Sequence, residues 1–169
     1  MRKRLLIARQ HMRTDTQLVV PDTIDPNWKI GIVASSFYKD EIDSLVEGAI
    51  DELVKAGIDP KNCERFDVPG SFEIPLIGSA VAKKGEVDAL IGLGIIIEGQ
   101  TQHARLLAEQ SARGIMDVQL QYVIPFAFEV LYVDTLADAQ KRCSGEGNKG
   151  KEAASAVLHS LAALKSINA

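Results

Sequence analysis

The chain has 169 residues, of which 46% are hydrophobic and 25% are charged, and its formal net charge is −4 at pH 7. This length favours one domain with a packed core, and the apolar residues are too interspersed with charge for a membrane span. An acidic balance gives no electrostatic case for nucleic-acid binding, because nucleic-acid binders present a basic face. Composition therefore predicts a mildly acidic, soluble globular protein.

Cysteine usage indicates a reducing compartment. Cys63 and Cys143 are the only cysteines, and neither stands in a CxxC pair or near a histidine cluster. Disulfide frameworks and zinc sites need such spacings, so we expect two free thiols in a cytoplasmic protein. The basic start of the chain is followed by an apolar run that ends at Ala8, which is too short for a secretory signal.

Residues 1–28 differ from the rest of the chain. They show no helical period, and Pro21 and Pro26 interrupt regular structure. We expect an N-terminal arm outside the main fold, which could pair with a neighbouring subunit, and one α/β domain over residues 29–169.

From residue 29 onward, short apolar runs alternate with amphipathic stretches. The apolar runs predict strands at 29–34, 64–68, 88–97 and 122–133, the last interrupted by Pro125. Helical spacing of apolar residues predicts helices at about 40–56, 73–83, 103–116, 136–143 and 151–164. Strands separated by such helices need crossover connections, so we expect a parallel sheet of about four strands with helices on both faces.

Ligand sites in such sheets lie outside the carboxyl ends of the strands. Phe37 follows the first predicted strand, where it could stack on a flat heterocycle or pack beneath the following helix. The stretch VPGSFE, residues 68–73, follows the second, where Pro fixes φ and Gly permits a positive φ, so we expect a tight turn. Ser71 could bind polar ligand groups there, whereas Glu73 could equally be a charge that suits a helix N-terminus.

The third predicted strand end leads into GQTQH, residues 99–103. Backbone amides and the Thr101 hydroxyl at a helix start could form an anion site, and the imidazole of His103 could move protons there. By itself, the histidine is explained equally well by a structural role and by a catalytic one. The glycines nearby do not form the G-x-G-x-x-G turn of dinucleotide-binding proteins.

The last candidate segment begins at Arg142, whose planar guanidinium suits phosphate. Asn148 could cap the final helix, with Lys149 at its start. A solvated helix end followed by a Gly-rich loop explains the same residues.

Taken in order, these segments resemble lumazine synthase. The match covers residues 29 to about 164, and its specific parts are VPGSFEIPL (68–76), GLGIIIEGQTQH (92–103) and GNKGKEAA (147–154). The resemblance implies a flavodoxin-like three-layer α/β/α sandwich. It also implies condensation of 5-amino-6-(D-ribitylamino)uracil with 3,4-dihydroxy-2-butanone 4-phosphate to 6,7-dimethyl-8-ribityllumazine, the penultimate step of riboflavin biosynthesis. Neither a metal nor an organic cofactor is implied, and the assembly is a homopentamer with sites between subunits or a sixty-subunit icosahedral shell.

The resemblance further assigns residues to the site. His103 corresponds to the proton-transfer residue. The substrate-binding positions are Phe37, Ser71, Phe72, Glu73, Ile95, Ile96, Ile97, Gln100, Thr101, Phe128 and Arg142. By this resemblance, Phe37 stacks on the pyrimidine and the turn 71–73 holds the ribityl side of the substrate. The strand end 95–97 binds the pyrimidine edge, and the loop 100–101 holds the phosphate. Phe128 and Arg142 would come from the adjacent subunit.

Several neighbouring positions depart from the family pattern. Many members have Arg-Phe-Asn at 36–38, Arg at 98, an aromatic and an acid at 104 and 105, and an acid at 141. This chain instead has Ser36, Tyr38, Glu98, Ala104, Arg105 and Lys141. An archaeal-type riboflavin synthase and a non-catalytic lumazine- or flavin-binding shell protein are therefore the alternatives, and a nucleotide-binding Rossmann-type protein is a remote one.

Overall fold

The computed structural model describes residues 20, 21 and 23–168. Residues 1–19 and 22 of the predicted arm therefore lie outside the described residues. The end of that predicted arm lies against the domain, because Trp28 is buried in the core and Ile24 packs against it. The predicted boundary at residue 28 stays a prediction.

The described residues form strands and helices in alternation. In chain order they are β1 (Ile30–Ser35), α1 (Lys39–Lys55), β2 (Cys63–Val68), α2 (Ile74–Lys84), β3 (Ala89–Ile97), α3 (His103–Tyr122), β4 (Phe126–Val133), α4 (Leu136–Arg142) and α5 (Lys149–Ile167). Three short 3₁₀ helices connect them, namely η1 (Pro60–Asn62), η2 (Ser71–Glu73) and η3 (Gly145–Gly147).

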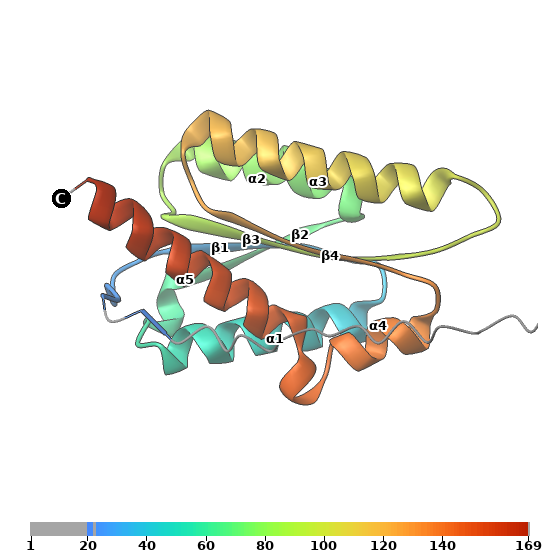
Figure 1. The fold of residues 1–169 in the computed structure, drawn as a ribbon, viewed down its shortest axis with the longest axis horizontal. Coiled ribbons are helices and arrows are strands. Elements are labelled where there is room, and N and C mark those ends of the chain that lie inside the picture. Colours follow the sequence, from blue (N-terminus) through green and yellow to red (C-terminus); the bar gives the residue numbers. More distant parts are fainter. Residues whose placement is uncertain (1–19, 22, 169) are drawn as a thin grey trace, which may run out of the picture.

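The four strands form one parallel sheet in the order β2-β1-β3-β4. Helices α2 and α3 cover one face, and α1, α4 and α5 cover the other (Figure 1). This confirms the predicted three-layer α/β/α sandwich. Because every strand runs in the same direction, all four carboxyl ends meet at one edge of the sheet.

The core lies on both faces of the sheet. On β1, Ile30, Ile32 and Ala34 belong to the cluster beneath α1 and α5, whereas Val33 belongs to the cluster beneath α2 and α3. Strand β3 is buried over nearly its whole length. Its continuous apolar sequence is therefore explained by helices on both faces, as in other buried parallel strands.

The ends of two helices differ from the prediction. Helix α3 continues to Tyr122 rather than ending near 116, because Val118 keeps one face of the added turns buried. The last strand consequently begins at Phe126 instead of 122. Helix α5 begins at Lys149, where the side chain of Asn148 accepts a 2.8 Å hydrogen bond from the Gly150 amide and caps the helix.

Two further observations concern the described residues. Cys63 and Cys143 are free thiols, as predicted. Among the helices of residues 20, 21 and 23–168, none combines the length and the apolar character that a membrane crossing requires.

Candidate functional site

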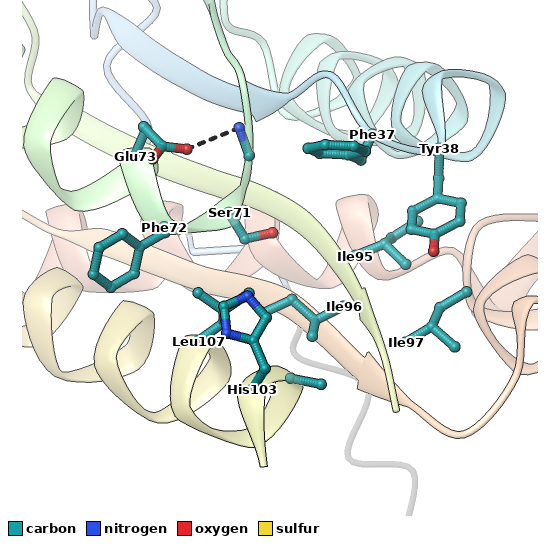
Figure 2. A pocket seen from close by; sticks show the side chains of 12 residues that line it. Phe37, Tyr38, Ser71, Phe72, Glu73, Ile95, Ile96, Ile97, His103 and Leu107 are labelled. Carbon is teal, nitrogen blue, oxygen red and sulfur yellow. Dashed lines mark hydrogen bonds between the residues drawn. The ribbon is translucent and has the colours of Figure 1, made fainter. Parts of the chain in front are cut away.

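A cavity of about 390 Å³ opens at the carboxyl ends of β1, β2 and β3. Its walls come from the start of α1, the turn at η2, the end of β3 and the first turns of α3 (Figure 2). The lining residues are Phe37, Tyr38, Gly70, Ser71, Phe72, Glu73, Ile95, Ile96, Ile97, His103, Ala104 and Leu107. Eight of the twelve residues predicted for the site are among them.

Phe37 forms a wall of this cavity rather than a plug beneath α1. Its side chain is 65% exposed, which excludes the core-packing alternative. The preceding Ser36 fixes the loop, because its amide and its hydroxyl each donate a 2.9 Å hydrogen bond to the Val68 carbonyl. The loop after β1 is thereby held beside the loop after β2, with Phe37 facing the space between them.

The turn after β2 is closed by its own glutamate. One carboxylate oxygen of Glu73 accepts a 3.0 Å hydrogen bond from the Gly70 amide (Figure 2). Gly70 has an extended backbone, with φ −146° and ψ 177°, so the turn forms without the positive φ that glycine permits. The missing side chain at Gly70 leaves room for two neighbours. A Cβ at this position would lie 3.2 Å from the Glu73 carboxylate and 3.6 Å from the Phe37 ring.

The end of β3 forms the floor of the cavity. Ile95 and Ile96 are buried and Ile97 is half-buried. The strand continues its pairing past Ile97, since the Glu98 amide donates a 2.8 Å hydrogen bond to the Val133 carbonyl. A ligand at this floor would therefore contact backbone groups and apolar side chains rather than charged groups.

His103 is the first residue of α3, and its imidazole points into the cavity toward Ile96 and Ser71 (Figure 2). The Thr101 hydroxyl accepts a 3.4 Å hydrogen bond from the His103 amide, which fixes the start of the helix. Thr101 and Gln100 are exposed on the loop outside the cavity lining. The structure thus brings the histidine to the cavity and leaves the two predicted phosphate-loop residues at its rim.

Phe128 and Arg142 lie outside this cavity. Phe128 is an exposed residue of β4, and Arg142 ends α4, where its guanidinium donates a 2.8 Å hydrogen bond to the Asp138 carbonyl. Hydrogen bonds from Thr135 and then Lys141 hold the pKa of the Asp138 carboxyl below its ordinary value. The predicted phosphate-binding arginine therefore stands in an exposed, partly acidic setting on its own subunit.

Four lining residues were not predicted, namely Tyr38, Gly70, Ala104 and Leu107. Helical spacing could have found one of them, because Leu107 stands four residues after His103 and therefore on the same side of the helix. The described residues contain no group of three His, Cys, Asp or Glu side chains placed to hold a metal ion.

Two comparisons with known proteins agree with this geometry. A model of the family described as 6,7-dimethyl-8-ribityllumazine synthase matches residues 27–165, which include the whole cavity lining. The 6,7-dimethyl-8-ribityllumazine synthase of Protochlamydia amoebophila (strain UWE25) is 43% identical over 134 residues, which are 79% of this chain and 78% of that protein.

Proposed function

Since the chain belongs to the 6,7-dimethyl-8-ribityllumazine synthase family, we propose that it makes 6,7-dimethyl-8-ribityllumazine in the cavity described above. The substrates are 5-amino-6-(D-ribitylamino)uracil and 3,4-dihydroxy-2-butanone 4-phosphate. Their condensation belongs to riboflavin biosynthesis and releases inorganic phosphate and water.

One observation carries the proposal for the site. Phe37 after β1, the turn at η2 and His103 after β3 are far apart in the sequence, yet they line one cavity. That cavity offers a flat aromatic face, a polar turn and a titratable imidazole, which match the three parts of the aminouracil substrate's chemistry. A flat pyrimidine needs stacking, a ribityl chain needs hydrogen-bond partners, and imine chemistry needs proton transfer.

The reaction needs positioning and proton transfer more than a strong nucleophile. One amine of the uracil adds to the ketone, and the resulting carbinolamine loses water to form an imine. Elimination of phosphate then leaves an enol that becomes a second carbonyl. The other amine adds to this carbonyl, and loss of a second water closes the ring. A positioned imidazole contributes about 10²–10⁴-fold by general acid–base catalysis. Holding both substrates in register can contribute roughly 7–11 kcal/mol more. We assign the proton transfers to His103.

Binding is divided among the walls. Phe37 stacks on the pyrimidine, the strand end of Ile95 to Ile97 contacts the pyrimidine edge, and the turn of Ser71, Phe72 and Glu73 holds the ribityl chain. The exposed loop of Gln100 and Thr101 holds the phosphate at the rim. Glu98 beside this loop weakens anion binding. Arg105 forms its main ion pair with Glu109, at 2.7 Å, and attracts Glu98 only weakly, so it offsets this effect in small part.

The site is completed by a second copy of the chain. Phe128 and Arg142 are exposed and lie outside the cavity of their own subunit, which supports their contribution to a neighbour's site. We infer a cytoplasmic homopentamer, with a sixty-subunit shell as its larger form. Light scattering of the purified protein distinguishes the two assemblies.

The decisive experiment mixes the purified protein with both substrates and follows lumazine absorbance. Product formation supports the synthase. Binding of lumazine without turnover favours the non-catalytic shell protein, conversion of lumazine to riboflavin favours the archaeal-type riboflavin synthase, and NAD binding favours the Rossmann-type alternative.

A further inference from the structure

Tyr38 has an unusual backbone conformation at the edge of the cavity. It is the N-cap residue of α1 and lies in the left-handed region, with φ 57° and ψ 53°. Bulky side chains rarely adopt this conformation, which glycine and asparagine accept readily. The Tyr38 side chain makes no capping hydrogen bond to the helix either. Both the dihedral angles and the capping position would be better served by asparagine.

The Tyr38 side chain reaches the cavity instead. Its ring lies beside Phe37 and Ile95, and the phenol hydroxyl points toward Ile97 (Figure 2). At this end of the cavity the hydroxyl therefore stands among isoleucine side chains. Tyr38 is 37% exposed, so a ligand in this end of the cavity would cover its hydroxyl. A ligand without a matching polar group would then leave the hydroxyl unpaired, which discriminates between ligands.

Strained backbone persists where the surrounding structure or the function requires it. The described residues contain one other non-glycine residue with positive φ, Val123 at the end of α3, with φ 51°. Val123 is 71% exposed and lies outside the cavity lining. Both residues therefore have a strained left-handed backbone, but only Tyr38 lines the cavity.

We propose that Tyr38 is a specificity-determining residue for the ring-bearing substrate, with its ring as a second aromatic wall and its hydroxyl as a hydrogen-bond partner of the pyrimidine. A phenol can donate to a ring carbonyl or accept from a ring N–H, and a uracil presents both groups. The inference rests on the proposed function, and it concerns affinity for the aminouracil rather than the proton transfers assigned to His103.

The test compares three variants in the two-substrate assay and in thermal unfolding. Tyr38→Asn and Val123→Asn should both raise Tm, because each removes left-handed strain. Of these two variants, Tyr38→Asn alone should raise KM for the aminouracil, by about tenfold or more, while its KM for the butanone phosphate stays within about twofold. Tyr38→Phe should leave Tm unchanged and raise KM for the aminouracil by roughly three- to tenfold, the loss of one hydrogen bond.

Several outcomes overturn the inference. An unchanged KM for the aminouracil in both Tyr38 variants shows that the side chain is only tolerated, and equal increases of both KM values show that it only shapes the cavity. If Tyr38→Asn does not fold, Tyr38→Phe decides. Fluorescence titration with 6,7-dimethyl-8-ribityllumazine separates this inference from the proposed function. A wild-type protein that binds it without turnover removes the function alone, and weaker binding by Tyr38→Phe then still supports Tyr38. A wild-type protein that does neither overturns both.

Discussion

The hydroxyl of Ser111 donates a 3.1 Å hydrogen bond to the backbone carbonyl of Ser71, and both residues are buried. This contact ties α3, the helix that begins with His103, to the turn that forms another wall of the cavity. Gly94 makes room for the turn, because a Cβ at this position would lie 2.4 Å from the Ser71 hydroxyl oxygen. The Ser111 hydrogen bond and the absence of a side chain at Gly94 thus help to set the distance between α3 and the turn at Ser71.

Removal of that contact should loosen the turn. Ser111→Ala removes one of the two hydrogen bonds that the buried Ser71 carbonyl accepts, the other coming from the Ile74 amide, which costs about 0.5–1.5 kcal/mol of unfolding free energy. We expect this loss in urea unfolding, together with a lower kcat/KM. Ser160→Ala is the matched control, because its hydroxyl bonds the Ala156 carbonyl on an exposed helix face, and it should stay within about 0.5 kcal/mol. Equal losses of unfolding free energy in the two variants would show that the buried hydrogen bond stabilises the fold no more than the exposed one.

Loss of the imidazole should slow the chemistry and leave the fold intact. His103 is exposed at the start of α3 and contributes no core packing, so His103→Ala should lower kcat by at least about tenfold with an unchanged Tm. His103→Gln should be as slow, because an amide hydrogen-bonds but does not titrate. If His103→Gln recovered wild-type turnover, proton transfer would have to be assigned elsewhere.

Arg142 should act on the phosphate-bearing substrate of a neighbouring subunit. Arg142→Ala is expected to raise KM for the butanone phosphate by about tenfold or more, since charge-assisted hydrogen bonds to an anion are strong. A phosphate-free ligand should bind the variant as well as it binds the wild type. An equal loss for both ligands would argue against a phosphate contact.

Mixed assemblies test whether the site is shared between subunits. A ring that contains both His103→Ala and Arg142→Ala subunits has some sites with an intact histidine from one subunit and an intact arginine from the next. Refolding the two variants together should therefore give more activity than the sum of the separate variants. Activity equal to that sum would place both residues in a single subunit's site.

A charge cluster between α1 and β2 should set part of the acid stability. Asp43 accepts hydrogen bonds from Lys39 and, at 2.8 Å, from Arg65, and these two bonds hold the pKa of the Asp43 carboxyl below its ordinary value. A lowered folded-state pKa stabilises above the unfolded value and is lost as pH falls through the folded value. Asp43→Asn should therefore cost about 1 kcal/mol near pH 7 and progressively less below about pH 4.

Asp51, which is exposed on the same helix, supplies the control for this pH dependence. Asp51→Asn should change the unfolding free energy by less than about 0.5 kcal/mol at pH 7. A loss in Asp43→Asn that persists undiminished at pH 3 would point to packing rather than to the ion pairs.

Local patterns predicted the sheet, and the strand ends together with the family resemblance pointed to eight of the residues that line the cavity. The failures have physical causes. The continuous apolar run of β3 and the turn residues after β2 are local signals, so their positions followed from the sequence. The ending of α3 depends on burial of Val118 by the rest of the fold, which no local pattern reports. Tyr38 was missed because its left-handed backbone, which places its side chain, is not encoded by residue type.

The buried thiol of Cys143 should be unreactive while the protein is folded. Burial raises the pKa of this thiol to about 11, and the side chain is 3% exposed. The thiolate is the reactive form, and at pH 8 a pKa of about 11 leaves roughly one thiolate in a thousand molecules. A thiol reagent at pH 8 should therefore label Cys63, which is only half-buried, and reach Cys143 only after urea unfolding.

The same burial gives an alkaline limit to stability. Because the folded-state pKa of Cys143 lies above the unfolded value of about 8.5, the thiol stabilises the fold below that pH, and this contribution is lost as pH rises through about 11. Cys143→Ala should therefore lose less unfolding free energy between pH 8 and pH 10 than the wild type. Identical losses in both proteins, measured by urea unfolding, would mean that Cys143 ionises as readily in the folded chain as in the unfolded one.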